Sequence, residues 1–355
     1  MIKDISVTLP QVAINQFLNS LLLSEIFYTN DIEGVKTSRV EISTVIQENN
    51  HPINGDDHIS KKRLGSTIKM YQRTQLGKKV EINVLQDYRK IYDSLLKGEL
   101  NEDRLPNGKI FRDKLPNSEV LSIGDGIKTV HRPPTTETAI KVALTALIEY
   151  MNNDDTPSIY KALVTHFFFE NTHPFLDGNG RMGRYLLSSY IANKFDRFTG
   201  FSVATAIHNN VQQYYKVFKD ADSAENRADL IFFIQKLLMI LVSQQEKVIK
   251  ILSQSREKLD KANEIISQWV NEHHHQLAAT SDSLYCNVLY LLAQSKLFTN
   301  QLDLGIKDND IIETLKKSNR HYPMTKTKAA IEELEALGAI EIVSKRPKQH
   351  VITIL

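Results

Sequence analysis

The stretch that decides the fold is "HPFLDGNGRMGR", residues 173–184. Pro174 disfavours an α conformation at His173, so a helix that runs into this stretch should end there. The residues "DGNG" are typical of a tight turn, and the pattern becomes helical from Gly180. The stretch therefore predicts a helix, a short loop and a second helix, with glycines at the start of the second helix.

The start of that second helix is suited to binding an anion. A helix N-terminus offers unpaired N–H groups and the positive end of the helix dipole. Gly178 and Gly180 would let a ligand approach the backbone closely. Arg181 and Arg184 are three residues apart and share a helix face, from which both can reach phosphate oxygens with forked donors.

Two further side chains of the stretch suit chemistry on a phosphate. Asp177 could hold Mg²⁺, which needs only one or two carboxylates besides substrate phosphates. His173 has an unperturbed pKa near neutrality and is the natural general base. A structural ion network at a helix start explains any one of these residues alone, but not all of them together. An EF-hand is excluded because Phe175 stands where a ligand is needed, and the chain contains no P-loop motif.

The composition indicates an ordinary globular protein. The chain has 355 residues, of which 41% are hydrophobic and 24% charged, with a net charge of +2. This balance predicts no general attraction to nucleic acid or to a membrane surface. No apolar run is long enough to span a membrane, and the start of the chain does not resemble a signal peptide. The single cysteine, Cys286, fits a reducing compartment, so we expect a cytoplasmic protein.

Hydrophobic periodicity predicts a mainly α protein. With the bounds of its core taken from the family resemblance described below, the chain divides into an N-terminal helical region (1–79), the core that holds the motif (80–235) and a connecting helix (236–279). Residues 280–355 read as three helices and a strand pair, which is the order of a winged helix. Within the core, "SEVLSIGDGIKTVHR" (118–132) predicts a short hairpin.

The motif resembles the signature of the Fic domain, H-x-F-x-[D/E]-G-N-G-R-x-x-R, at all eight specified positions. The segment "IGDG…HRPP" resembles the flap hairpin of that family and the Pro-Pro turn that follows it. The stretch "QQYYKVF" (212–218) resembles its tyrosine-containing helix near the nucleotide base. The resemblance covers residues 80–235 and implies an all-helical core with a small β flap.

Most Fic enzymes transfer AMP from ATP to a protein hydroxyl and release pyrophosphate. The resemblance implies that His173 deprotonates a Ser, Thr or Tyr hydroxyl of the target, that Asp177 binds Mg²⁺ and that Phe175 is a buried anchor. It implies that Arg181 holds the β-phosphate region and Arg184 the γ-phosphate. The remaining implied contacts are with phosphate (Gly178, Asn179, Gly180), with adenine (Tyr214 or Tyr215) and with the backbone of the target (Ser122, Ile123 and Gly124 of the flap). Two core tyrosines on a helix are an equally good interpretation of "YY".

A second stretch, "TNDIEG" (29–34), fits the inhibitory pattern [S/T]-x-x-x-E-[G/N] of the family. Thr29, Glu33 and Gly34 occupy its specified places, and Gly34 is a plausible residue to end a helix. The resemblance implies that Glu33 pairs with Arg184, repels the γ-phosphate and so prevents alignment of ATP. In some relatives this glutamate positions a water that removes AMP. Without the motif, a solvated glutamate at a helix end would be the simpler interpretation.

The charge of the C-terminal region bears on its partners. Residues 300–355 hold nine basic and eight acidic residues, a net charge of +1. The helix expected to read DNA, "TKTKAAIEELEALG", carries three glutamates, whereas a DNA-binding helix presents a basic face. We therefore favour protein docking or dimerisation for this region, with DNA binding as the alternative. The expected partners are ATP, an unidentified target protein, a second copy of the chain and, in self-modification, the protein itself.

The sequence thus predicts an autoinhibited protein adenylyltransferase. Two alternatives stay open. The same site could transfer another phosphate-linked group, or the chain could be a DNA-binding regulator whose Fic core senses nucleotide.

Overall fold

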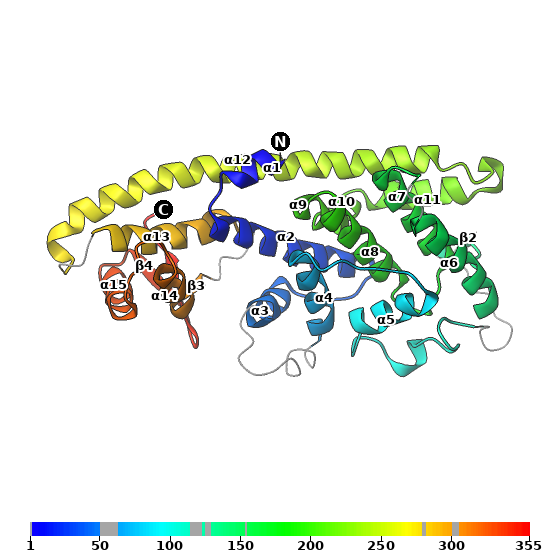
Figure 1. The fold of residues 1–355 in the computed structure, drawn as a ribbon, viewed down its shortest axis with the longest axis horizontal. Coiled ribbons are helices and arrows are strands. Elements are labelled where there is room, and N and C mark those ends of the chain that lie inside the picture. The colour runs from blue at the N-terminus through cyan, green and yellow to red at the C-terminus, as the bar shows by residue number, and fades with distance from the viewer. Residues whose placement is uncertain are drawn as a thin grey trace. The chain divides into compact units, whose positions relative to one another are not determined.

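The computed structural model describes residues 2–49, 63–113, 123–124, 129–152, 155–278, 282–299 and 305–355. Over these residues the protein is mainly helical and carries two small antiparallel sheets, which confirms the predicted fold class (Figure 1). No helix in these ranges is long and apolar enough to cross a membrane.

The chain divides into two compact units. One comprises residues 21–247, and the other comprises residues 1–20 together with residues 248–355. Helices α2 (Gln11–Ile32) and α12 (Ile231–His273) each contribute residues to both units. The domain boundaries drawn from the sequence stay a prediction, and each unit is described by itself below.

The unit of residues 21–247 holds most of the helices and the first sheet. In chain order its remaining elements are α3 (Arg39–Asn49), α4 (Gly65–Gln75), α5 (Leu85–Leu95), the 3₁₀ turn η2 (Glu102–Arg104), β1 (Ile123–Gly124), β2 (Thr129–His131), α6 (Glu137–Asn152), α7 (Ser158–Thr172), α8 (Asn179–Lys194), α9 (Arg197–Gly200), α10 (Val203–His208), α11 (Val211–Asp222) and the 3₁₀ turn η4 (Ala224–Asn226).

Helix α8 lies at the centre of this unit. It packs against α4, α7, α9 and α10, so it is buried on nearly every side (Figure 1). Its polar residues must then find partners inside the protein. The Ser188 hydroxyl donates to the Gly200 carbonyl at 2.7 Å, and the Ser189 hydroxyl lies 3.2 Å from the Thr74 hydroxyl. This packing fixes the start of α8, where the motif lies.

An aromatic cluster anchors the motif loop between α7 and α8. The fully buried ring of Phe175 stacks on Tyr92 of α5, with ring centroids 3.7 Å apart. The ring of Phe111 meets Phe175 edge-on at 5.7 Å. Tyr88, one turn before Tyr92 on α5, stacks on Phe169 of α7 at 5.7 Å. The packing of these rings therefore holds the loop against the helices α5 and α7.

The first sheet is the hairpin of β1 and β2, which fits the predicted flap. Ile123 pairs with His131, and Gly124 pairs with Thr129. Of the residues assigned to target docking, Ile123 and Gly124 form β1, whereas Ser122 lies outside the described residues.

The unit that includes residues 248–355 carries the second sheet. Its elements are α1 (Ile2–Val7), the 3₁₀ turn η5 (His274–Gln276), α13 (Asp282–Leu297), β3 (Ile306–Lys307), α14 (Asp308–Lys316), α15 (Met324–Ala336), β4 (Ile340–Lys345) and β5 (Lys348–Ile352). The strands are antiparallel in the order β3-β5-β4. Strand β3 was not predicted, because two residues are too few to show a period. The assignment of a winged helix stays a prediction.

We expect Phe175→Ala to destabilise the unit of residues 21–247 by about 3–5 kcal/mol, since it removes a fully buried ring and leaves a cavity. Hydrogen exchange of the α7 and α8 amides would measure the loss. Phe168→Ala is the matched control, because that ring is 44% exposed. Equal effects of the two substitutions would contradict the anchoring role of Phe175.

Candidate active site

The loop that carries the predicted catalytic histidine begins with a break in the backbone. Helix α7 ends at Thr172, and His173 adopts the left-handed conformation (φ 48°) as its C-cap. Its N–H donates to the Phe169 carbonyl at 3.1 Å. This conformation is uncommon outside glycine, and surrounding contacts must hold it.

Arg112 supplies several of those contacts. Its guanidinium is buried and donates to the carbonyls of His173 (2.7 Å), Pro134 (2.7 Å) and Thr172 (3.4 Å). Its backbone N–H donates to the Pro174 carbonyl at 2.9 Å. Burial lowers the pKa of Arg112 to about 10, so it stays charged near neutral pH. Arg112 therefore joins the end of α7, the motif loop and the segment that follows the flap.

Asn179 closes the loop from the other side. Its amide nitrogen donates to the Phe175 carbonyl at 2.9 Å, and its amide oxygen accepts the Phe175 N–H at 2.9 Å. This side chain is therefore occupied in shaping the loop. The backbone N–H groups of Asn179, Gly180 and Arg181 begin α8 and have no acceptor among the described residues. They form the open helix N-terminus that the sequence predicted for phosphate.

Asp177 is the residue of this loop best placed to meet a metal ion. Its side chain is 43% exposed, and one carboxylate oxygen accepts the Gly178 N–H at 2.5 Å. The Tyr92 hydroxyl donates to its backbone carbonyl at 3.0 Å and holds it against α5. Among the described residues no cluster of three His, Cys, Asp or Glu side chains forms a metal cage. A single exposed carboxylate beside a phosphate site is nevertheless the donor set that Mg²⁺ uses with nucleotides.

Arg181 has a partner that the sequence analysis did not find. One of its terminal nitrogens lies 3.0 Å from Glu99, and both side chains are buried. The other lies 3.8 Å from Asp177. Glu99 also accepts the Thr67 hydroxyl at 2.6 Å. Glu99 reaches Arg181 because the loop after α5 carries it to the motif. No spacing in the sequence indicates this contact.

Arg184 is held by the end of α2. Its side chain is only 2% exposed. The Nε atom donates to the Thr29 hydroxyl at 2.9 Å, and Nη2 donates to the Thr29 carbonyl at 3.0 Å and to Glu33 at 2.7 Å. Thr29 and Glu33, which precede Arg184 by 155 and 151 residues in the chain, thus both bind its guanidinium.

The Glu33 carboxylate also rests on the backbone of α8 at Gly180. A Cβ atom at position 180 would lie 2.2 Å from the Glu33 Oε1 atom and 3.0 Å from Arg184 Nη1. Only glycine leaves room for a carboxylate this close to the first turn of the helix. Glu33 therefore lies against the first turn of α8 as well as against Arg184.

Ionisation favours this arrangement at neutral pH. Burial opposes the charge on Glu33, but the charge and hydrogen bond of Arg184 outweigh it, so the pKa of Glu33 is lowered. The ion pair of Glu33 with Arg184 therefore contributes fully to stability when the pH is above the ordinary pKa of glutamate. This contribution is lost as the pH falls through the lowered pKa of Glu33. Burial would lower the pKa of Arg184, but nearby Glu33, Tyr214 and Glu170 raise it overall.

The position of Glu33 is set by the way α2 ends. Gly34 is left-handed (φ 69°) and its N–H donates to the Asp31 carbonyl at 3.0 Å. The N–H of Val35 donates to the Asn30 carbonyl at 2.9 Å. This pair of bonds is a Schellman motif, so Gly34 ends the helix as predicted and Glu33 is its last, C-cap residue.

The structure distinguishes between the two tyrosines of α11. Tyr214 is buried, and its hydroxyl lies 2.8 Å from the His166 Nε2 atom. Tyr215 is 51% exposed. Burial lowers the pKa of His166 to about 3, so it is a neutral core histidine. Tyr215 is thus the one with a surface free to meet a ligand.

The motif loop lies in a region that matches a known protein family. Residues 82–191, which include α7, the motif loop and most of α8, match the model of the Fic/DOC family. The chain contains a Fic domain. A Fic family protein from Desulfovibrio desulfuricans has a similar fold, with a TM-score of 0.51 and 17% identity over 98% of this chain and 89% of that one. A Fic domain-containing signalling protein from Bacteroides thetaiotaomicron matches 71% of this chain and 92% of its own, with 13% identity and a TM-score of 0.47.

The Fic domain should depend on Arg112 for the shape of its motif loop. We expect Arg112→Met to weaken binding of ADP with Mg²⁺ at least tenfold, because the carbonyls that it holds lose charged donors. Calorimetric titration would measure the affinity. Arg104→Met is the control, since that side chain is 61% exposed and forms an ion pair with the likewise exposed Asp103 on the surface. Unchanged affinity in Arg112→Met would show that the loop keeps its shape without this residue.

Proposed function

We propose that this protein transfers AMP from ATP to a hydroxyl group of a target protein and that Glu33 holds it inactive. The Fic domain supports a nucleotidyl or related transferase. The observation that carries the finer proposal is the Glu33 carboxylate, seated on Gly180 at the start of α8 and bound by Arg184. A carboxylate in that place imitates and excludes a terminal phosphate.

In the proposed reaction the target hydroxyl oxygen attacks the α-phosphorus of ATP. The bond from that phosphorus to the bridging oxygen of the β-phosphate breaks, and pyrophosphate leaves. His173 accepts the hydroxyl proton, because it is the imidazole of the motif loop. Phosphoryl transfer of this kind depends mainly on alignment and on stabilisation of charge. The N–H groups at the start of α8 and the guanidinium of Arg181 supply donors for the phosphates.

Asp177 would hold Mg²⁺, which neutralises phosphate charge when it is bound. The half-exposed carboxylate fits that role, since one of its oxygens already accepts the Gly178 N–H and is thereby oriented. Tyr215 would contact adenine, while Tyr214 supports it from the core. The β1–β2 hairpin would bind the target backbone by strand addition.

Inhibition follows from competition for one place. Arg184 makes three hydrogen bonds to the end of α2, so it cannot take a γ-phosphate while Glu33 and Thr29 occupy it. The negative charge of Glu33 also repels the γ-phosphate. ATP bound beside Glu33 would lie out of line, and misalignment of about 1 Å can cost on the order of a hundredfold in rate.

The direct test uses ATP labelled on the α-phosphate, in parallel with ATP labelled on the γ-phosphate. Wild type, Glu33→Gly and Glu33→Gly/His173→Ala are each incubated alone and with cell lysate. We expect protein-bound label from the α position only, strongest in Glu33→Gly and absent in the double variant. The reason is that removal of the carboxylate frees Arg184, while removal of the imidazole removes the base.

Other outcomes of this test distinguish the alternatives. Label from the γ position would mean a phosphotransferase. Equal α label in wild type and Glu33→Gly would contradict inhibition by Glu33. Absence of label in all samples, with nucleotide still bound, would favour a regulator that senses nucleotide, and salt-sensitive DNA binding would then support that alternative.

A substitution at the end of α2 should increase activity less than Glu33→Gly does. Gly34→Ala places a Cβ in the left-handed conformation, which costs about 1–2 kcal/mol and should loosen Glu33 without removing it. We expect α-label incorporation between that of wild type and that of Glu33→Gly. Gly77→Ala is the matched control, because Gly77 (φ 79°) ends α4 with the same pair of hydrogen bonds but far along the chain from Glu33. A similar gain in both variants would mean that general loosening, and not the position of Glu33, controls activity.

A further inference from the structure

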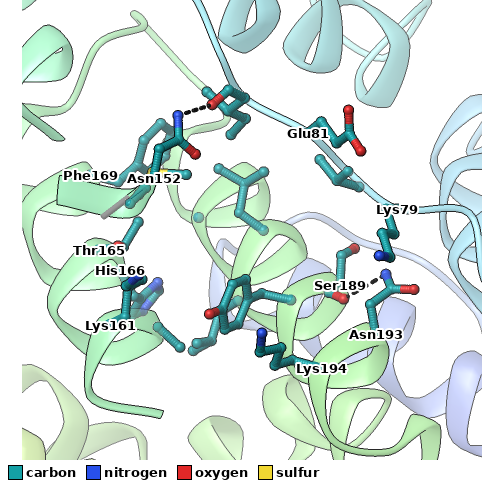
Figure 2. A pocket seen from close by; sticks show the side chains of 18 of the residues that line it. Lys79, Glu81, Asn152, Lys161, Thr165, His166, Phe169, Ser189, Asn193 and Lys194 are labelled. Atoms are coloured by element: carbon teal, nitrogen blue, oxygen red, sulfur yellow. Dashed lines mark hydrogen bonds between the residues drawn. The ribbon is translucent and has the colours of Figure 1, made fainter. Parts of the chain in front are cut away.

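A cavity lies in the unit of residues 21–247, apart from the residues of the proposed nucleotide site. Its volume is about 510 Å³, and it is lined by residues 79–83 before α5, the end of α6 and parts of α7 and α8 (Figure 2). Gly183 is the one motif residue in its lining, and none of the residues assigned to phosphate or metal contributes. Such a cavity is large enough for a small organic molecule.

The charge of the lining is mostly positive. Lys79, Lys161 and Lys194 line the cavity, against a single acid, Glu81 (Figure 2). Lys79 and Lys194 are exposed, but Lys161 is only 6% exposed. Lys161 has no ion pair or side-chain hydrogen bond with any residue in the described part of the chain. Three lysines against one glutamate give the lining a net positive charge, so the site favours an anion.

A neutral donor accompanies this lysine. Thr165 is one turn along α7 from Lys161, and both line the cavity. The Thr165 hydroxyl oxygen is buried and has no hydrogen-bond partner among the described residues. Buried hydroxyl groups are normally bonded, so this one also lacks the partner that a ligand would supply.

The rest of the wall is largely apolar. Phe169 of α7 and Leu186 and Leu187 of α8 contribute to it. An inorganic anion would satisfy Lys161 but would leave this wall facing water. A molecule with an apolar body would cover the wall and gain about 25 cal/mol for each Å² that it buries.

We propose that this cavity binds a small organic anion, a carboxylate or phosphate monoester attached to an apolar body. The acidic group lies beside Lys161 and Thr165, and the body packs against Phe169 and Leu186. Lys79 and Lys194 attract the anion to the site.

The cavity shares one wall with the Fic centre. His166 lines it and, through Nε2, contacts the hydroxyl of Tyr214 at 2.8 Å. Its other ring nitrogen, Nδ1, has no partner of hydrogen-bond geometry among the described residues, although the backbone of Gly183 lies close by. The two sites are therefore neighbours across a single side chain, but they use different residues to bind an anion.

The test is a titration of the full-length protein with phenyl phosphate, followed by ligand-observed saturation-transfer NMR in the presence of saturating ADP and Mg²⁺. We expect phenyl phosphate to bind and ADP not to displace it. Benzyl alcohol, the uncharged counterpart of phenyl phosphate, should bind at least tenfold more weakly. Lys161→Met should weaken the binding at least tenfold, since it keeps the length of the side chain and removes its charge. Lys219→Met, on the exposed side of α11, is the control and should bind as wild type does.

A second variant separates loss of the site from loss of the fold. Leu186→Trp keeps Lys161 and narrows the cavity, so it should also abolish binding, while circular dichroism shows that the helices remain. The proposal fails if ADP displaces the probe, if Lys161→Met and Lys219→Met bind equally, or if Leu186→Trp retains full affinity. It fails as well if wild type shows no binding below about 10 mM.

Discussion

A buried guanidinium requires an anion, and the Fic domain of this protein is arranged around that requirement at Arg184. Two other acids lie near Arg184, Glu25 and Glu170, but burial raises the pKa of each to about 8. Both are therefore mostly neutral at pH 7, and the compensating charge comes from Glu33. When Glu33 leaves, the most favourable replacement is another anion, and a nucleotide phosphate is one.

The motif loop beside Arg184 is held rigidly by buried contacts. The side chain of Asn179 and the guanidinium of Arg112 bond to the backbone of the loop from opposite ends, while the ring of Phe175 holds its centre. A cradle held by buried groups does not adjust its shape to different occupants. In the proposed function, the Glu33 carboxylate and a nucleotide phosphate would therefore compete for the same fixed donors, and the charge and reach of each would decide which one binds.

The motif could be predicted from the sequence because its chemistry is local. Helix end, turn and helix start lie within twelve residues, and the loop geometry agrees with that expectation. The contact of Glu33 with Arg184 could be anticipated only through the inhibitory pattern, since hydrophobic periodicity says nothing about contacts between distant segments. Arg112 and Glu99 were missed for the same reason, and no pattern marks either residue.

Other differences between the predicted site and the observed one arise from the packing of side chains. Spacing alone could not show that Tyr214 is buried against His166 while Tyr215 is exposed, because neighbouring residues on a helix face different directions. The side chain of Asn179 was expected among the phosphate contacts, yet both of its polar atoms bond the backbone of Phe175. The cavity beside Lys161 is formed by segments from four parts of the chain, and a linear sequence gives no sign of it.

The attachment of α2 has a consequence for how inhibition would be relieved. Glu25, two turns before Glu33, accepts the Ala204 N–H at 2.7 Å and is fully buried. The helix is thus secured in the core independently of its last turn. Release of Glu33 requires only that residues 29–34 fray, with the Schellman bonds and the contacts of Arg184 broken and the rest of α2 in place. Under the proposed inhibition by Glu33, the threshold for activation would be a local opening free energy, separate from the global stability of the fold.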